Sequence, residues 1–323
     1  MKRLFKVLLA LVVLAVLAAL GGVGYVMARY PDVPEAETIT VEATPERLAR
    51  GQYLVEHVTV CIDCHSQRDM TKYAGPVKPG TEGGGGEFFG DEAAGLRLYS
   101  RNITPAGIGE WTDGELIRAM TTGVNPSGEA LFPIMPYQRY ASLDTEDVQA
   151  IVAYIRTLKP VTSHVPEREL PFPLPLVVRT MPAAARPQAR PSPDDRWRDG
   201  RYLVNAAACG DCHSPMDDQG QIIAGREFSG GMEFPLPGGG VVRSANISPD
   251  RETGIGAWTE EQFVQKFKAF EHWAGEDLSA AEQRENTVMP WLKYAGMTEQ
   301  DLRAVYNYLR FLPPVRNRVT KFN

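Results

Sequence analysis

The same series of short motifs occurs twice in this chain, in the same order. The matched blocks are RGQYLVEHVTVCIDCHS (50–66) with DGRYLVNAAACGDCHS (199–214), SRNITP (100–105) with SANISP (244–249), GIGEWTDGEL (107–116) with GIGAWTEEQF (254–263), IMPY (134–137) with VMPW (288–291), and LDTEDVQAIVAYIRTLKPV (143–161) with MTEQDLRAVYNYLRFLPPV (297–315). Five blocks in one order indicate a duplication, so the chain is expected to fold as two similar halves.

A proline-rich stretch separates the two halves. We expect a first domain over 44–160, a linker over 161–193 and a second domain over 194–317. Because proline resists both helix and sheet, the linker is expected to be extended and semi-rigid. Its apolar part, 172–178, is expected to lie against the first domain rather than in water.

Helix signals dominate both halves, so the predicted fold class is mainly α. Val148, Ile151, Val152 and Ile155 give the last helix of the first half one apolar face, and the second half matches it. The glycine-rich pieces, 81–90 and 228–240, are expected to be loops with short strand character. The predicted helix-start residues are Thr44 and Ser192, each before a proline, the capping boxes Thr112/Glu115 and Thr259/Gln262, and Asp144 and Thr298 before the last helices.

The N-terminus carries a segment suited to a membrane. Lys2, Arg3 and Lys6 precede an uncharged run over 7–28, which is long enough as a helix to cross a bilayer. Val26-Met27-Ala28 would serve as a cleavage site, so 1–30 is either an anchor or a signal sequence. We favour a single N-terminal anchor because the apolar run exceeds that of a typical signal peptide.

The charge pattern then fixes the expected location. Basic residues before the span keep the N-terminus in the cytoplasm, which places the protein in a bacterial inner membrane with its body in the periplasm. The lipid bilayer is thus one predicted partner. A net charge of −6 on 323 residues gives no basic face for nucleic acid, and none is expected as a partner.

All four cysteines lie in two CxxCH motifs, Cys61/Cys64 before His65 and Cys209/Cys212 before His213. Disulfides leave the histidines unexplained, a redox dithiol lacks its βαβ context, and a zinc site with four cysteine ligands would have to join both halves. Haem c uses every residue, because two thiols bind the vinyl groups and the histidine ligates iron. Two covalently bound haem c groups are therefore predicted.

A second axial ligand is expected from the same half. Met135 and Met289 stand at equivalent places in the duplication, each followed by proline, whereas the other methionines lack such partners. A lone methionine is more often core filler, but the repeat favours ligation here. The predicted iron ligands are therefore His65 with Met135 and His213 with Met289.

Two further side chains recur in both halves, namely Asn102 with Asn246 and Trp111 with Trp258. They are interpreted either as capping and packing residues or as donors to the haem propionates. Both interpretations stay open at this point.

Each half resembles a class I cytochrome c domain, with CxxCH near the first helix, a late Met-Pro and a closing amphipathic helix. The NITP, GIG.WT and MPY series is similar to that of the cytochrome c subunits of membrane-bound alcohol and gluconate dehydrogenases. That resemblance implies covalent attachment at both cysteine pairs and the axial ligand pairs given above. Those subunits usually carry three such domains, whereas this chain has two and an N-terminal anchor, a layout closer to dihaem subunits of respiratory oxidase complexes.

The expected function is electron transfer rather than catalysis. A membrane-anchored periplasmic dihaem cytochrome would carry electrons between a dehydrogenase or quinol-linked complex and a terminal acceptor. The expected partners are a membrane-bound or periplasmic dehydrogenase, or an oxidase or quinol-oxidising complex. The alternative is a dihaem redox enzyme such as a peroxidase, which needs an open position at one iron; the paired methionines argue against it.

Overall fold

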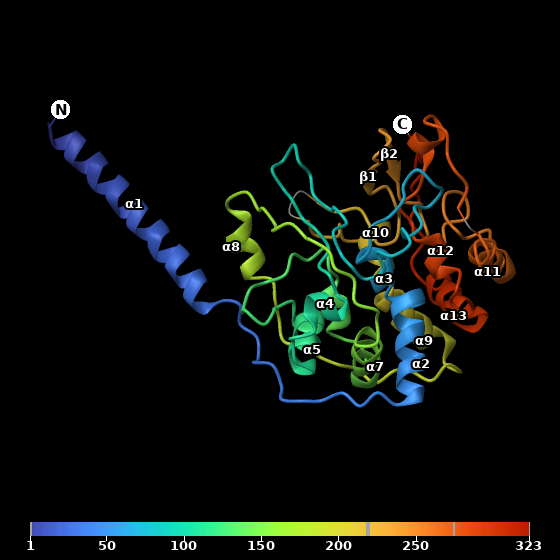
Figure 1. The fold of residues 1–323 in the computed structure, drawn as a ribbon. Helices are drawn as coiled ribbons and strands as arrows, with labels where there is room; N and C mark the ends of the chain where they lie inside the picture. Colours follow the sequence, from blue (N-terminus) through green and yellow to red (C-terminus); the bar gives the residue numbers. More distant parts are fainter. Residues whose placement is uncertain (1, 218–219, 274, 323) are drawn as a thin grey trace.

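A computed structural model describes residues 2–217, 220–273 and 275–322, and within them the fold is mainly helical, as predicted. Figure 1 shows a long helix projecting from a body built of short helices and loops. The elements are α1 (Lys2–Arg29), α2 (Pro45–Tyr53), the π-helix η1 (Leu54–Val58), α3 (Cys61–Cys64), α4 (Pro105–Ile108), α5 (Asp113–Thr122), α6 (Tyr137–Tyr140), α7 (Thr145–Ile155), α8 (Leu174–Arg179), α9 (Arg196–Ala206), α10 (Cys209–His213), β1 (Glu233–Pro235), β2 (Val241–Arg243), α11 (Glu260–Lys268), the 3-10 helix η2 (Glu282–Glu285), α12 (Trp291–Tyr294) and α13 (Glu299–Arg310).

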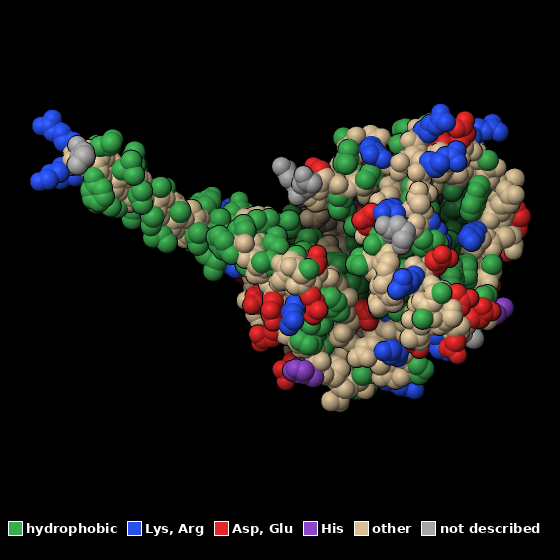
Figure 2. Space-filling model, turned by 90° about the horizontal axis from the view of Figure 1, so that it is seen from above, with side chains coloured by type: hydrophobic (Ala, Val, Ile, Leu, Met, Phe, Trp, Pro, Cys, Tyr) green, Lys and Arg blue, Asp and Glu red, His purple; other side chains and the backbone are tan. Residues whose placement is uncertain are grey.

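Most of the helix α1 projects from the body, and its C-terminal end contacts α8. None of its residues is buried, and its mean hydropathy reaches 2.8 over an 18-residue window. Figure 2 shows hydrophobic side chains along its length and Lys and Arg at its free end. At 1.5 Å per residue it is about 42 Å long, enough to cross a hydrocarbon core of about 30 Å. Length and composition therefore suit an anchor, and they are also compatible with a signal sequence.

In each half, the helix before the cysteines packs against the last helix. These pairs are α2 with α7 and α9 with α13. A glycine makes each close crossing possible: a Cβ on Gly51 would lie 1.9 Å from the Ala150 carbonyl oxygen, and one on Gly200 would lie 1.9 Å from that of Ala304. The recurring glycine of the RGQY and DGRY blocks is thus explained by helix packing.

The two halves differ by one residue just before their cysteines. Eight positions lead from Tyr53 to Cys61, and seven lead from Tyr202 to Cys209. The first half absorbs the extra residue in the π-helix η1, where one more residue fits into the helical path. Val60 (φ 44°) and Ala208 (φ 50°) then take the same left-handed conformation, so both cysteine turns start alike.

The predicted helix starts are confirmed except at Ser192. Asp195, three residues later, caps α9 by accepting a hydrogen bond from the Arg198 backbone N–H (3.1 Å). Ser192 instead accepts one from the Asp194 N–H (3.3 Å), which turns the chain before the helix begins. The predicted caps that are present are Thr44, Asp144, Thr298 and the capping boxes of Thr112 and Thr259.

The proline-rich linker lies along the first half and is not wholly extended. It includes α8, so the expectation of no helix was wrong over 174–179; Pro175 falls in the first turn, where its missing N–H costs no hydrogen bond. Backbone hydrogen bonds join Arg97 to Glu169 and Arg186 to Ala141. Within its apolar part Val178 is buried, whereas Phe172 points into solvent.

The two halves share one hydrophobic core and meet through matched hydrogen bonds. Tyr53 donates to Asp301 of the second half (2.5 Å), and Tyr202 donates to Asp147 of the first (2.7 Å). The two tyrosines are equivalent in the duplication, and so are the two aspartates. Each half therefore offers the other the same contact, as in a two-fold symmetric interface.

An insertion strengthens this interface on one side. The second half is ten residues longer between SANISP and VMPW, and the extra chain lies against the loop 69–76 of the first half. The Tyr73 ring stacks on Phe270 (5.9 Å between centroids). Asn286 donates hydrogen bonds to the backbone carbonyls of Met70 and Lys72. The insertion therefore adds contacts between the two halves.

One pair of equivalent positions breaks the symmetry. Arg50 forms a two-point ion pair with Asp147 (2.8 and 2.7 Å), but the matching residue of the second half is Asp199. Asp199 is fully buried, and neither carboxylate oxygen has a hydrogen-bond partner among the described residues. Its nearest cation is Arg190, at 3.8 Å. Burial, together with Asp301, raises the pKa of Asp199.

The glycine crossings give a first prediction. Gly51→Ala is expected to lower the free energy of unfolding by about 1–3 kcal/mol, because the added methyl group forces α2 away from α7. Denaturant unfolding followed by circular dichroism measures this. Gln52→Ala, an exposed neighbour on the same helix, is the control and should change stability little. Equal stability of the two variants would contradict the close crossing.

Asp199 gives a second prediction. Because its pKa is raised in the folded state, the charged carboxylate disfavours folding, and stability falls as the pH rises above the ordinary value of 3.8. Asp199→Asn is therefore expected to raise the melting temperature at pH 8, with the gain vanishing towards pH 4. Asp147→Asn is a control with the opposite expected effect. It removes the ion pair of Arg50 and should lower the free energy of unfolding by about 3 kcal/mol. A lower melting temperature for Asp199→Asn at pH 8 would overturn the assignment.

Candidate haem-binding site

Both CxxCH motifs form one short helical turn, α3 and α10, and both present their histidine in the same way. His65 Nδ1 lies 2.7 Å from the Arg101 carbonyl oxygen, and His213 Nδ1 lies 2.8 Å from that of Ala245. A carbonyl oxygen only accepts, so Nδ1 must carry the proton in each ring. Nε2 of each histidine is then left with a free lone pair, the state required of an iron ligand.

Glycine-rich loops connect each CxxCH histidine to the segment that carries its acceptor carbonyl. Gly85 donates to the His65 carbonyl and Gly230 to the His213 carbonyl, both at 2.7 Å. Each glycine has a positive φ (71° and 70°), and an added Cβ would lie 2.5 Å or less from the backbone before Asn102 or Asn246. The loops expected at 81–90 and 228–240 therefore seat the segments that orient the histidines. Of the expected strands, β1 and β2 form one antiparallel pair at the second of these loops.

The methionine segments are tied to the cysteine segments of the same half. Met135 and Met289 are half-buried against the shared core, just before α6 and α12. The Tyr140 hydroxyl donates to the Thr59 carbonyl (3.3 Å), and the Tyr294 hydroxyl donates to the Ala207 carbonyl (2.9 Å). The fold therefore brings together the segments that carry the predicted axial ligands, whose ligation stays a prediction.

Sequence reasoning missed Tyr140 and Tyr294. Both are buried, and both stand five residues after the methionine in MPYQRY and MPWLKY. Burial, and then the cysteines of the same half, raise the pKa of each hydroxyl well above the usual value. Their matching position after each Met-Pro was the signal that would have found them.

The surrounding protein disfavours the charged forms of the cysteines and histidines in both motifs. Cys64 and Cys212 have accessible surface, yet the surrounding protein raises the pKa of Cys64 to about 12 and that of Cys212 to about 11. Burial likewise lowers the pKa of His65 and His213. Neutral thiols and neutral imidazoles are therefore favoured at both motifs.

This donor set suits a macrocycle that brings its own metal. Two thiols one helical turn apart, an adjacent imidazole with a free Nε2 and a methionine in the same half match covalent attachment and axial ligation of haem. Among the described residues, no three His, Cys, Asp or Glu side chains converge as they would around a bare ion. The predicted attachment residues thus fit haem c better than zinc.

The recurring asparagines are engaged by the protein itself. Asn102 donates to Val161 and Ser163, and Asn246 donates to Thr253 and Val315. These bonds hold each amide against other segments of its own half, which is a packing role; neither asparagine is the N-cap of a helix. Contact of either amide with a propionate stays a prediction.

The recurring tryptophans differ in their surroundings. Trp111 packs on the core beneath the Arg101 guanidinium, 5.2 Å from the ring centroid, whereas Trp258 is exposed. A haem contact of either indole also stays a prediction.

The two cysteine turns lie close to each other across the interface. In Figure 1, α3 and α10 are neighbours at the centre of the body. The charge of a Cys212 thiolate acts on the pKa of Cys64, and that of Cys64 acts on the pKa of Tyr294. The interface therefore places the two candidate sites side by side.

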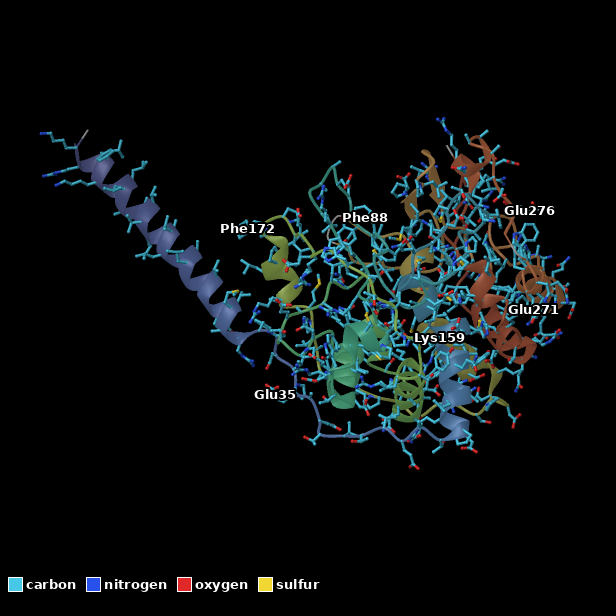
Figure 3. All side chains as sticks on the ribbon, viewed as in Figure 1. Glu35, Phe88, Lys159, Phe172, Glu271 and Glu276 are labelled. Atoms are coloured by element: carbon cyan, nitrogen blue, oxygen red, sulfur yellow. The ribbon has the colours of Figure 1, made fainter. Side chains whose placement is uncertain are left out.

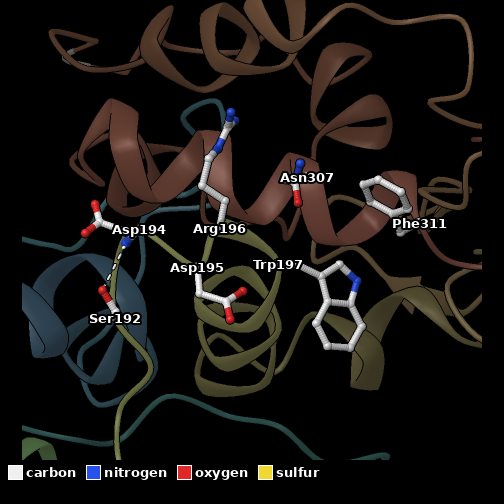
Figure 4. A pocket seen from close by; sticks show the side chains of 7 residues that line it. All are labelled: Ser192, Asp194, Asp195, Arg196, Trp197, Asn307 and Phe311. Atoms are coloured by element: carbon white, nitrogen blue, oxygen red, sulfur yellow. Dashed lines mark hydrogen bonds between the residues drawn. The ribbon is translucent and has the colours of Figure 1, made fainter.

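An open groove elsewhere carries none of the predicted ligands. It has a volume of about 810 Å³ and lies between the start of α9 and the end of α13 (Figure 4). Its side chains are Ser192, Asp194, Asp195, Arg196, Trp197, Asn307 and Phe311. Nothing in this set matches haem attachment.

Comparison with known proteins bears out the resemblance seen in the motifs. The chain is 31% identical over 288 residues to the fructose dehydrogenase cytochrome subunit of Gluconobacter japonicus, covering 82% of this chain and 52% of that protein. It is 30% identical over 291 residues to the alcohol dehydrogenase (quinone) cytochrome c subunit of Gluconacetobacter polyoxogenes, covering 85% and 58%. A diheme cytochrome c-type protein of Cereibacter sphaeroides is 27% identical over 267 residues, covering 79% and 82%.

The chain is thus similar over most of its length to cytochrome c subunits of dehydrogenases. It spans slightly more than half the length of the fructose and alcohol dehydrogenase subunits. No protein-family model matches it.

The tyrosine contacts give a third prediction. Tyr294→Phe is expected to lower the free energy of unfolding by about 1 kcal/mol, because the Ala207 carbonyl loses its hydrogen bond. Tyr140→Phe should cost less, since its bond is longer. Denaturant unfolding of the purified protein measures both. Tyr25→Phe, exposed on α1, is the control and should change nothing. A Tyr294→Phe protein as stable as this control would show that the hydrogen bond to the Ala207 carbonyl does not stabilise the fold.

Proposed function

We propose that the chain is a membrane-anchored electron-transfer protein with two haem c sites, acting as a cytochrome subunit beside a dehydrogenase. The observation that carries this proposal is the matched geometry of His65 and His213, each oriented by a backbone carbonyl beside its cysteine pair. The relatives named above, cytochrome subunits of dehydrogenases, support an electron-transfer role rather than a catalytic one. Their names give no support to the peroxidase alternative.

Each half would hold one haem with its own residues. Cys61 and Cys64 would attach the first group, and Cys209 and Cys212 the second. When bound, haem c carries one electron by cycling its iron between the ferrous and ferric states. On this proposal 44–160 and 194–317 are two class I cytochrome c domains, joined by the linker that lies along the first.

Methionine ligation would suit electron transfer. Met135 and Met289 would fill the remaining axial positions and leave no open site for a substrate. A thioether ligand raises the reduction potential relative to a second imidazole. The side-by-side placement of α3 and α10 supports the proposal that electrons pass between the two sites within one chain.

The proposed location follows from α1. With Lys2, Arg3 and Lys6 in the cytoplasm, α1 would cross the bacterial inner membrane and hold the body in the periplasm. Candidate partners are a membrane-bound or periplasmic dehydrogenase and an oxidase or quinol-oxidising complex. The body would then carry electrons along a respiratory chain from a dehydrogenase or a quinol-oxidising complex to a terminal acceptor such as an oxidase.

A ligand exchange tests the proposal. Met289→His is expected to leave both haems attached and to lower one of two midpoint potentials, because histidine replaces the thioether. A potentiometric titration followed by absorption measures both components. Met181→His, at a methionine without a partner in the duplication, is the control and should leave both potentials unchanged.

Two results would count against this proposal. Unchanged potentials in Met289→His would remove Met289 from the ligand set. A high-spin ferric signal in electron paramagnetic resonance of the resting protein would indicate an open iron position and favour a redox enzyme.

A further inference from the structure

An apolar segment of the linker faces solvent at the edge of the body. Between Glu169 and Arg179 the chain reads LPFPLPLVV, without a charge. The Phe172 side chain is 80% exposed, more than any large hydrophobic residue of α1, where Phe5 reaches 70%. Val177 is also exposed, one residue before the buried Val178. One side of this segment is thus fixed to the protein while the other meets water.

The segment sits beside the end of the proposed membrane span. Helix α8 packs against α1, and Arg179 donates to the Met27 carbonyl (3.0 Å). Figure 3 labels Phe172 at the edge of the body nearest α1, and Figure 2 shows hydrophobic side chains continuing from α1 onto the body. The exposed apolar surface is therefore continuous with the membrane helix.

Residues at the same end of α1 are typical of a membrane boundary. Tyr25 is exposed, and Tyr30 and Arg29 follow it, with Arg29 paired to Asp32 (2.5 Å). Tyrosine rings and basic side chains are enriched where the bilayer meets water. Arg179, the last residue of α8, contacts Met27 at this level, so the apolar segment lies next to the expected membrane boundary.

We propose that the segment 172–178 enters the lipid interface beside α1 and gives the body a second contact with the bilayer. The proposal rests on α1 being the membrane anchor. Phe172 and Val177 would lie among the acyl chains, as the apolar face of an interfacial helix does. One helix alone leaves the body free to tilt, and a second contact fixes its orientation. Because the exposed apolar side of this segment is continuous with the apolar surface of α1, we expect lipid rather than a protein to contact it.

Thiol labelling in vesicles tests the contact. The four native cysteines are consumed by haem attachment on the proposed function, so Phe172→Cys adds the single reactive thiol. The full chain is placed in vesicles of phosphatidylcholine and phosphatidylglycerol and labelled with a water-soluble maleimide. Phe311→Cys is the matched control, because Phe311 is 72% exposed at the end of α13, away from α1. Intact mass gives both rates.

We expect the Phe172→Cys thiol to react about tenfold or more slowly than the Phe311→Cys thiol, because one unit of raised pKa removes tenfold of the reactive thiolate. Equal rates in vesicles to which the protein binds would overturn the lipid contact alone and leave this surface to a protein partner. Failure of the protein to float with vesicles would overturn the anchor as well. Val177→Cys, on the same exposed side, repeats the test if Phe172→Cys does not fold.

Discussion

The hydrogen bond from each CxxCH histidine to a backbone carbonyl organises the rest of this structure. It fixes the tautomer of His65 and His213, and it needs a carbonyl held at one place. The SRNITP and SANISP blocks supply that carbonyl from Arg101 and Ala245, and the glycine-rich loops hold these blocks against the cysteine turns. Residues spread over one half of the chain thus converge on the orientation of one imidazole ring.

Duplication explains the arrangement of the halves, and the departures from it show where each half adapted. Tyr53 and Tyr202 make reciprocal contacts across the interface, which places the two cysteine turns next to each other. The π-helix η1 accommodates one extra residue in the first half. The insertion around Phe270 adds contacts to the first half on one side of the interface. The second half has Asp199 where the first half has Arg50, and this buried carboxylate is poorly paired. Burial of the shared hydrophobic core offsets the free-energy cost of that carboxylate.

Much of this fold was predictable because its signals are local. Proline, capping boxes and apolar periodicity predicted the helices, and repetition identified the cysteine, histidine and methionine residues. The prediction that Ser192 caps a helix was wrong because a serine before proline can also form a turn. Asp194 and Asp195 follow it and compete for the cap position. Tyr140 and the role of Asp199 depend on contacts between distant segments, and the helix in the linker depends on packing against α1.

Counting haem groups tests the central claim most directly. The full chain, made with a cytochrome c maturation system, is denatured in alkaline pyridine, and the haemochrome is quantified per chain. Two covalently held haems per chain are expected, and replacing Cys209 and Cys212 with alanine should leave one. A colourless chain despite working maturation, or one haem in the unaltered protein, would contradict the account.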